Sequence, residues 1–251
     1  MKHRALQIVY LIVAIAIVFV ASDNTIRFSL LGALLFVYSL VIGLASYRFQ
    51  WNFFMNATHH GKVGTLTITF DDGPHPEHTP AILEILKQHN VPATFFMIGK
   101  HVDEHPTIAK KVADAGHEIG NHSYNHRNRH GILSTQKVAE EIAQCNGAIT
   151  KATGVHTHYY RPPFGVTNPN IASAVGHSNV QAIGWDIRSL DTTTSDADAL
   201  LKRITDRLEN GSILLLHDTQ LVTVAVLPRL LQYCKQNNIS VISLKESLKK
   251  A

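Results

Sequence analysis

Apolar residues gather in two long runs at the start of the chain. The first run covers residues 5–21 and the second covers 28–46, with the short polar stretch Ser22–Thr25 between them. A helix needs about 17–25 mostly apolar residues to cross a bilayer, and both runs reach that length. We therefore predict a membrane segment at residues 1–48, made of two transmembrane helices joined by a tight loop.

The alternative is a cleaved signal peptide followed by a single anchor. Lys2 and Arg4 precede the first apolar run, and residues 20–22 form a weak cleavage site. If both runs span the membrane, Lys2, Arg4 and Arg48 lie at one end of the hairpin and Arg27 lies in the loop. The positive-inside rule then favours the cytoplasm for the rest of the chain.

Beyond a linker expected at residues 49–63, strand-like and helix-like patterns alternate. Thr79 and Pro80 are expected to open a helix as its cap and first residue, and Ser195–Asp198 resembles a capping box. The expected strands cover 65–70, 93–98, 118–120, 179–185, 212–216 and 240–244. The other expected helices cover 106–115, 134–153, a segment from 195 that stops at Gly211, and 221–237.

This alternation predicts an α/β fold with a parallel sheet and helices outside it. The domain is expected to cover residues 64–251, which is short for a regular eightfold barrel of roughly 250 residues. A barrel with fewer or irregular strands fits this length better. We predict a distorted (β/α) barrel with about seven repeats, preceded by the transmembrane hairpin.

Composition narrows the classes of function. Hydrophobic residues make up 45% of the chain and charged residues 17%, which excludes a disordered charged tail. The net charge of +4 is small and spread along the chain, so it favours no nucleic-acid partner, and no protein partner is inferred. Cys145 and Cys234 form no CxxC pair and are expected to be free or buried thiols. His59 and His60 are expected to be exposed.

Polar side chains cluster where predicted strands end. In parallel α/β folds the carboxyl ends of the strands meet at one edge of the sheet, and this edge carries the active site. The residues in question are Asp71–Pro74, His122–His126, Arg161–Gly165, Trp185–Asp186 with Asp191, and His217–Asp218. Five such groups at five strand ends are hard to explain by packing alone.

Two imidazoles and one carboxylate would make a metal site with an open position. His122 and His126 are four residues apart, and either Asp71 or Asp72 can supply the carboxylate. Such a ligand set suits a divalent metal, zinc first. The second carboxylate can then accept a proton from water, with the Arg161 guanidinium to keep it ionised and oriented. The ordinary alternatives are turn chemistry for the aspartates and a surface pair for the histidines.

His217 follows an apolar run at a strand end and is best interpreted as a general acid, rather than a core histidine. Asp186 or Asp191 is the candidate to hold its imidazole. Leu215 or Leu216 is the candidate for an apolar wall against a small acyl group.

Taken together, these motifs resemble the polysaccharide deacetylases of carbohydrate esterase family four, which share the NodB homology domain. The resemblance covers roughly residues 64–244. The TFDDGP motif stands at Thr69–Pro74, HSxxH at His122–His126, RxPF at Arg161–Phe164 and LxHD at Leu215–Asp218. Four motifs in the same order are specific in combination.

The resemblance implies a role for each motif residue. It implies Asp71 as the base, Arg161 as the residue that orients it, His217 as the acid, the Phe164 backbone amide as an oxyanion donor, and Asp72, His122 and His126 as metal ligands. It also implies a distorted (β/α) barrel. Zn²⁺ is the first candidate for the ion, with Co²⁺, Mn²⁺ or Ni²⁺ also acceptable to these ligands.

The fourth motif departs from the family pattern. The family often has DxxDW, and residues 188–192 align with it. Asp191 is kept, but Arg188 replaces the first aspartate and Thr192 replaces the tryptophan. The sequence therefore leaves open how His217 is tuned and how the acyl pocket is shaped.

The resemblance implies removal of N-acetyl groups from polysaccharide that contains N-acetylglucosamine, such as peptidoglycan or a chitin-like polymer. The alternatives are an O-acetyl xylan esterase, a deacylase of a lipid-linked sugar at the inner leaflet, and an inactive glycan-binding protein. The expected location is a bacterial-type cytoplasmic membrane. The family's substrates favour the outer face, whereas the charge bias favours the inner one.

Overall fold

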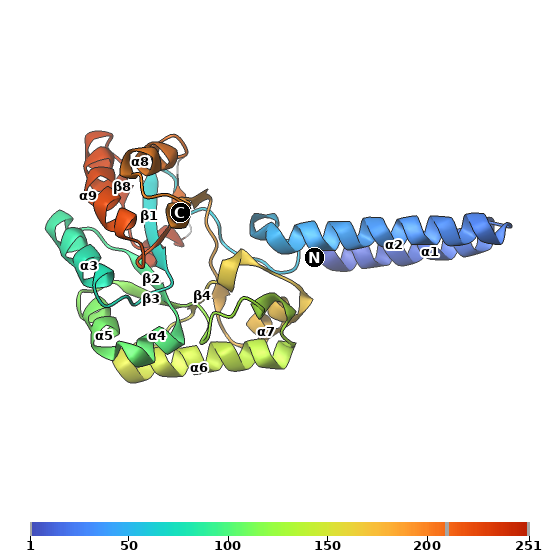
Figure 1. Ribbon diagram of the computed structural model, residues 1–251, viewed down its shortest axis with the longest axis horizontal. Helices are drawn as coiled ribbons and strands as arrows, with labels where there is room; N and C mark the ends of the chain where they lie inside the picture. The colour runs from blue at the N-terminus through green and yellow to red at the C-terminus, as the bar shows by residue number, and fades with distance from the viewer. Residues whose placement is uncertain (1, 209–210, 250–251) are drawn as a thin grey trace.

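The computed structural model describes residues 2–208 and 211–249, which form a long helical hairpin and a rounded α/β domain (Figure 1). The hairpin consists of α1 (Lys2–Val20) and α2 (Asn24–Tyr47). Asp23 ends the turn between them and caps α2, because its carboxylate accepts a hydrogen bond from the Ile26 N–H at 2.9 Å. The predicted apolar runs thus fall within two antiparallel helices.

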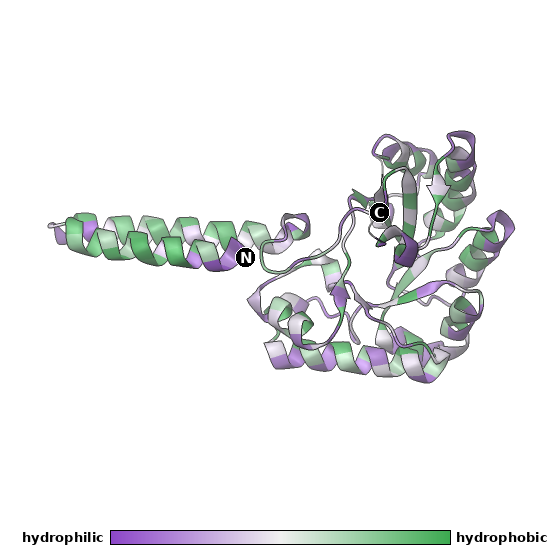
Figure 2. Cartoon of the chain, turned by 180° about the vertical axis from the view of Figure 1, so that it is seen from behind, coloured by the Kyte–Doolittle hydropathy of each residue, from purple (hydrophilic) through white to green (hydrophobic). Residues whose placement is uncertain are grey.

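Figure 2 shows that most residues of the hairpin are apolar, with polar residues mainly near its two ends. In the described part of the chain no residue of α1 is buried, and Ala45 is the one buried residue of α2. A helix that is apolar all round but exposed needs an apolar partner or a bilayer. With 19 and 24 residues, α1 and α2 are long enough and apolar enough to cross a membrane.

The end of α2 is fixed to the domain. The Thr167 N–H donates to the Ser46 carbonyl at 3.0 Å. Phe49 begins a short 3-10 turn, η1 (Phe49–Trp51), and is only 2% exposed. Its ring lies edge-on against His59 at 4.9 Å and against Trp185 at 5.9 Å. The hairpin therefore joins the domain through packed contacts.

The segment expected to be a linker, 49–63, also packs on the domain. Thr58 forms a parallel bridge with Ile183, and Phe54 and Met55 are buried. The expectation that His59 is exposed is wrong: it is 7% exposed, because its Nε2 reaches the side chain of Asn52 at 3.1 Å and the segment folds over it.

One parallel sheet forms the centre of the domain. Its strand order is β5-β4-β3-β2-β1-β7-β6, with β8 beside the start of β1, and the end strands β5 and β6 do not pair with each other. The sheet is therefore a curled, open half-barrel, as the predicted distorted barrel requires. The strands are β1 (Thr65–Asp71), β2 (Thr94–Met97), β3 (Glu118–Asn121), β4 (Tyr159–Tyr160), β5 (Gln181–Ala182), β6 (Ile187–Arg188), β7 (Ser212–His217) and β8 (Ser240–Val241).

Helices cover the outer side of this sheet (Figure 1). The central strand β1 is buried along its whole length and pairs with both β2 and β7. Its apolar side chains belong to the main hydrophobic core, as is typical of a central strand in a parallel sheet. The helices are α3 (His78–His89), α4 (Gly99–Glu104), α5 (Pro106–Asp114), α6 (Thr135–Thr153), α7 (Pro169–His177), α8 (Ala197–Thr205), α9 (Leu221–Gln236) and α10 (Leu244–Ser247).

Two helix boundaries differ from the prediction. Helix α3 begins at His78, so Thr79 is not its cap. The Thr79 hydroxyl instead donates to Asp218 Oδ2 at 2.5 Å and accepts from the His75 N–H at 2.7 Å. Helix α8 does begin after a capping aspartate, Asp196, but it ends at Thr205 rather than at Gly211.

Two strands also differ. The expected strand 179–185 is reduced to β5, and beyond it the Gly184 N–H donates to the Thr58 carbonyl at 2.7 Å as part of the Thr58–Ile183 bridge. The expected strand 240–244 ends at Val241, and Ser243 caps α10 instead. The expected domain end at residue 251 lies outside the described residues.

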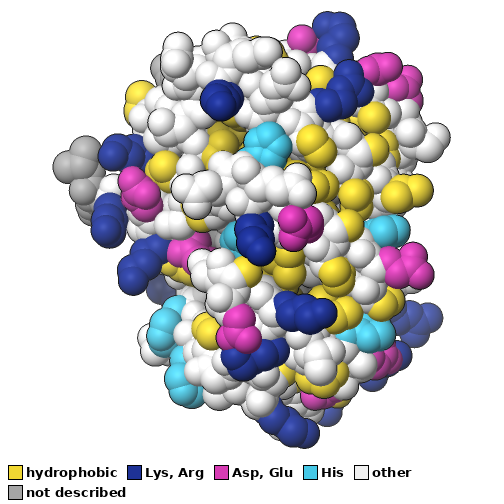
Figure 3. Space-filling model, turned by 90° about the vertical axis from the view of Figure 1, so that its left-hand side faces the viewer, with side chains coloured by type: hydrophobic (Ala, Val, Ile, Leu, Met, Phe, Trp, Pro, Cys, Tyr) yellow, Lys and Arg dark blue, Asp and Glu magenta, His cyan; other side chains and the backbone are white. Residues whose placement is uncertain are grey.

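The side of the domain that faces away from the hairpin has a mixed surface. In Figure 3 basic and acidic side chains alternate there with small apolar areas. Interspersed charges of both signs are typical of a solvated surface. Any concentration of positive charge that matters to function therefore has to be sought elsewhere.

We predict that Phe49→Ala destabilises the domain by about 3–5 kcal/mol, because it removes a buried aromatic ring and leaves a cavity. Tyr47→Ala is the matched control, since Tyr47 is 78% exposed, and it should change the free energy of unfolding by less than about 0.5 kcal/mol. Denaturant unfolding of the full chain in detergent measures both. Equal effects would contradict the docking described above.

Candidate active site

The carboxyl ends of β1, β3 and β7 bring the predicted residues to one place. In the sheet register Asp71, the last residue of β1, stands beside His217, the last residue of β7. Asp72 follows directly, and His122 comes one residue after the end of β3. The strand register thus explains why residues far apart in sequence meet here.

Three potential ligand atoms converge at this edge of the sheet. Asp72 Oδ1 lies 3.4 Å from His122 Nε2 and 3.3 Å from His126 Nε2, and all three atoms lie within 4.8 Å of one another. Asp72 Oδ1 is buried, yet it has no hydrogen-bond partner in the described part of the chain. His122 Nδ1 lies 2.8 Å from the Arg161 carbonyl, so Nδ1–H donates to that oxygen. The lone pair on Nε2 is then available to a metal.

Asp72 and His126 take the charge states that a divalent metal needs. Burial lowers the pKa of His122, but the Asp71 and Asp72 carboxylates outweigh burial and raise it, so a metal ion would displace a proton from this imidazole. Burial, followed by the charge of His122, lowers the pKa of His126 to about 3, so this imidazole is neutral at pH 7. Burial alone would raise the pKa of Asp72, but the contact with His122 and the charges of His126 and His217 hold it below the usual range. An ionised carboxylate beside neutral imidazole is a fitting set of metal ligands.

Asp71 is held by a buried guanidinium. Arg161 is fully buried, and its Nη1 donates to Asp71 Oδ1 at 2.6 Å and to the Thr69 hydroxyl at 2.8 Å. Its Nε and Nη2 donate to the carbonyls of Ile183 and Gly184 at 3.1 and 2.9 Å. Because its N–H groups donate to a carboxylate, a hydroxyl and two carbonyls, the guanidinium can be accommodated in the interior.

Two aromatic rings enclose that guanidinium. Its Cζ lies 4.0 Å from the ring centre of Phe96 and 5.5 Å from that of Trp185. Gly165, at φ +67°, passes so close to Trp185 that a Cβ there would stand 2.5 Å from the indole. The glycine after the RxPF motif is thus required by both its backbone conformation and its contact with Trp185.

His217 has a carboxylate behind its imidazole. Its Nδ1 lies 2.7 Å from Asp191 Oδ1, and its backbone N–H donates to Asp191 Oδ2 at 2.7 Å. Thr223 and Ser189 donate to the same carboxylate at 2.6 and 3.0 Å. Burial lowers the pKa of His217, but the hydrogen bond to Asp191 and its charge outweigh burial and raise it to about 9.

Of the two aspartates considered as partners for His217, Asp191 contacts the imidazole and Asp186 does not. Asp186 Oδ1 accepts the Ile213 N–H at 2.6 Å, and its Oδ2 lies 3.5 Å from Nδ1 of His60. Asp186 therefore fastens the segment before β6 to β7. Ser189 and Thr223 were not found by sequence reasoning, because hydroxyl residues at strand ends and in helices are common.

These groups face a small cavity of about 170 Å³. Leu215 and Phe164 line it, as expected, and so do Arg188 and Thr192 of the altered fourth motif. Phe164 has φ +59°, and its ring lies 4.6 Å from that of His126. A strained backbone at such a position is typical of functional sites. The full lining is Asp71, Asp72, His122, His126, Phe164, Gly165, Trp185, Arg188, Thr192, Leu215 and His217.

Glu141 holds the loop that carries His126, and sequence reasoning missed it. Its Oε2 accepts the backbone N–H groups of Tyr124 and Asn125 at 3.1 and 2.7 Å, and its Oε1 accepts the Asn125 side chain at 2.7 Å. The available signal was an acidic residue on the apolar face of a long helix, where Ile142 and Cys145 are also buried.

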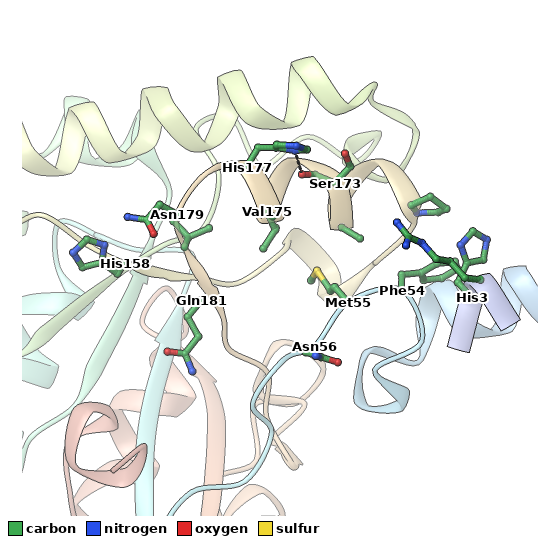
Figure 4. A pocket seen from close by; sticks show the side chains of 15 residues that line it. His3, Phe54, Met55, Asn56, His158, Ser173, Val175, His177, Asn179 and Gln181 are labelled. Carbon is green, nitrogen blue, oxygen red and sulfur yellow. Dashed lines mark hydrogen bonds between the residues drawn. The ribbon is translucent and has the colours of Figure 1, made fainter. Parts of the chain in front are cut away.

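A larger cavity of about 960 Å³ lies elsewhere, between the start of α1, residues 54–56 and α7 (Figure 4). His158 and His177 line it, but no carboxylate does. In Figure 4 His3 and Phe54 lie together at one end of it, where the hairpin meets the domain. Without a carboxylate this cavity has neither the base nor the ligand set described above.

Known proteins share both sequence and fold with this chain. The family model for polysaccharide deacetylase matches residues 46–183. A peptidoglycan-N-acetylglucosamine deacetylase of Listeria monocytogenes is 33% identical over 72% of this chain and 38% of its own length. A chitooligosaccharide deacetylase of Azorhizobium caulinodans is 35% identical over 61% of this chain and 73% of its own. The chain thus spans well under half of the Listeria relative.

Among solved structures, a CE4 family pseudoenzyme from Bacillus anthracis superposes with a TM-score of 0.71. It is 30% identical, and the match covers 76% of this chain and 67% of that one. The curled parallel sheet is therefore the fold of family-four carbohydrate esterases. With its motifs at the strand ends and a matching family model over more than half of its residues, the chain belongs to the polysaccharide deacetylase family.

Proposed function

We propose that the chain is a metal-dependent hydrolase that removes N-acetyl groups from saccharides containing N-acetylglucosamine. The observation that carries this proposal is the set of three groups on one small cavity: the Asp71–Arg161 pair, the Asp72 cluster and the His217–Asp191 pair. The relatives named as peptidoglycan-N-acetylglucosamine and chitooligosaccharide deacetylases support the substrate class.

Asp72, His122 and His126 would hold the ion, because their ligand atoms converge and the buried Asp72 Oδ1 has no other described partner. Zn²⁺ is the first candidate, and Co²⁺, Mn²⁺ and Ni²⁺ suit the same ligands. When bound, a divalent metal at this point polarises an acetyl carbonyl and makes water a better nucleophile at neutral pH.

Asp71 is the proposed base. Arg161 holds Oδ1, which leaves Oδ2 as the oxygen that takes the proton from the attacking water. This oxygen lies 3.6 Å from His122 Nε2, next to the proposed metal position. The guanidinium holds Asp71 in one orientation, so the base is in place before substrate arrives.

His217 is the proposed acid. Asp191 holds Nδ1, so Nε2 is the nitrogen free to give a proton to the leaving amine. The raised pKa keeps the imidazole protonated at neutral pH, as an acid requires. Leu215 lies on the cavity wall against which the acetyl methyl would fit, and the Phe164 N–H is the proposed donor to the oxyanion.

The fold alone does not imply turnover, since the Bacillus anthracis neighbour is described as a pseudoenzyme. The proposal of catalysis depends on the base, the acid and the metal ligands being present together in this chain. An inactive glycan-binding role would have no need of the buried Asp71–Arg161 pair or of a protonated His217.

We further propose that α1 and α2 anchor the domain in a membrane. Lys2, Arg4 and Arg48 lie at the domain end of the hairpin, whereas Arg27 lies at the loop end. This distribution favours the cytoplasmic face for the domain.

The full chain in detergent should release acetate from N-acetylglucosamine oligomers when zinc is added, and the release should stop when a chelator removes the zinc.

His217→Asn should lower kcat by about 10²–10⁴ and keep zinc, because it removes only the acid. Asp72→Ala should lose zinc as well. Acetate measured by a coupled assay, with acetylated xylan in parallel, separates amide from ester hydrolysis; release from xylan alone would refute N-deacetylation.

Asp191→Asn should move the alkaline limit of kcat/KM to lower pH. Activity needs protonated His217, so in the native protein it falls as pH rises through the raised pKa of about 9. Without the carboxylate the pKa falls, and the protonated form is lost at lower pH. Asp186→Asn is the control, because Asp186 does not contact His217, and its pH profile should match the native one. Identical shifts in both variants would contradict the assignment.

Glu141→Gln should weaken zinc binding by about 10- to 100-fold, because an amide group cannot accept all three N–H donors of the His126 loop. Glu140→Gln, at the preceding residue of α6, removes the same charge from the outer face of the helix and should leave zinc affinity unchanged. Competition with a coloured chelator measures both affinities. Equal zinc affinities for the two variants would show that the hydrogen bonds of Glu141 do not position His126.

A further inference from the structure

A second cavity of about 460 Å³ adjoins the active-site cavity on the side of the hairpin. The two share Phe164, Gly165, Trp185 and Arg188 as lining residues. The other wall of this second cavity is the segment 47–51, which begins with the last residue of α2. The second cavity therefore provides a path from the small cavity toward the end of α2. We call the second cavity the arginine groove.

Three guanidiniums line the arginine groove: those of Arg48, Arg188 and Arg207. All three residues are exposed, and none has an ion-pair partner within residues 2–208 and 211–249. Arg203 stands beside them, with its guanidinium donating to the Arg188 carbonyl at 3.2 Å. Burial and then the charges of Arg207 and Arg188 lower its pKa, so these cations lie close enough to repel one another.

One carboxylate, Asp186, also lines the groove, but it does not neutralise these cations. Its oxygens are directed to the Ile213 N–H and to His60. The groove therefore has an excess of positive charge beside the active site. Arg188 contributes to this excess at the position where the family often has an aspartate, so the substitution reverses the charge on that wall.

With α1 and α2 in a bilayer, as proposed above, the groove would start at the level of the membrane surface. Tyr47 ends α2 and is 78% exposed, and Trp51 is 46% exposed. Tyrosine and tryptophan at the end of an apolar helix are typical of the boundary between lipid and water. The Trp51 carbonyl accepts a hydrogen bond from Lys2 Nζ at 2.7 Å, so both ends of the hairpin meet there.

We propose that the arginine groove binds the phosphate of a saccharide that is joined through that phosphate to a membrane lipid, while its N-acetyl sugar occupies the active site. The proposal rests on the deacetylase function proposed above and names its substrate class.

Arginine suits this task because its planar guanidinium matches two phosphate oxygens at once and stays charged at every physiological pH. The lipid would remain in the bilayer beside α2. Water breaks only the bond between the acetyl carbon and the sugar nitrogen, giving acetate and an amine. The phosphate ester is bound but not cleaved.

The test compares three substrates of the full chain in nanodiscs of zwitterionic lipid. The first is N-acetylglucosamine joined through a phosphate diester to a short polyprenol. The second is the same sugar joined to the same alcohol by an uncharged glycosidic bond, and the third is soluble N-acetylglucosamine 1-phosphate. The variant is Arg48→Gln with Arg207→Gln, both outside the active-site cavity. Lys151→Gln with Lys235→Gln removes two distant exposed charges as the control.

We expect the double arginine variant to raise KM for the phosphodiester substrate at least about tenfold, as loss of charge-assisted hydrogen bonds does. Its kinetics on the uncharged glycoside and its melting temperature should not change, and the lysine control should match the native protein throughout. Equal effects on the charged and uncharged lipids, or no effect on either, would overturn the phosphate site.

If soluble N-acetylglucosamine 1-phosphate has the same KM as the lipid-linked substrate, the lipid attachment is overturned and the phosphate site remains. If no substrate, including soluble chitooligosaccharides, releases acetate with zinc present, the deacetylase function itself has failed. Failure of the groove would instead leave activity on uncharged oligomers intact.

Discussion

The ion pair between Asp71 and Arg161 is the interaction on which the rest of the site depends. Arg161 is buried, and it joins the end of β1 to the segment that follows β5 through hydrogen bonds to Asp71 and to two carbonyls. Its own carbonyl fixes the tautomer of His122. One residue thus sets the orientation of the proposed base and of a proposed metal ligand. Removal of either partner would leave a buried charge unpaired, which costs about 3–5 kcal/mol in proteins.

Much of this site could be predicted from the sequence, because the strand ends are marked by short motifs. The motifs identify Asp71, His122 and His217 at the ends of apolar strands, and the parallel register places Asp71 beside His217. The choice between Asp186 and Asp191 could not be made in this way, since both follow a strand end. It is decided by packing: Thr223, which lies on α9 and is distant in sequence, donates to Asp191.

The fold was predictable where pattern and packing agree, as in β1 and the hairpin. It was not predictable where a long-range contact overrides a local signal. Thr79 and Pro80 have the sequence of a helix start, but the Thr79 hydroxyl donates to Asp218, and the helix begins at His78, two residues before Pro80. The segment 49–63 has no clear periodicity, yet His59 and its neighbours cover the sheet. Such contacts join parts of the chain that no window of sequence contains.

The packed joint between α2 and the domain fixes the position of the candidate active site relative to the hairpin. Phe49 packs against Trp185, a residue that also lines the active-site cavity. With α1 and α2 in a bilayer, the candidate active site would therefore stay at a constant distance from the lipid surface, unlike that of an enzyme on a flexible linker. Glycans held further from the membrane would be out of reach, so the distance of an acetylated sugar from the membrane surface would decide whether it is a substrate.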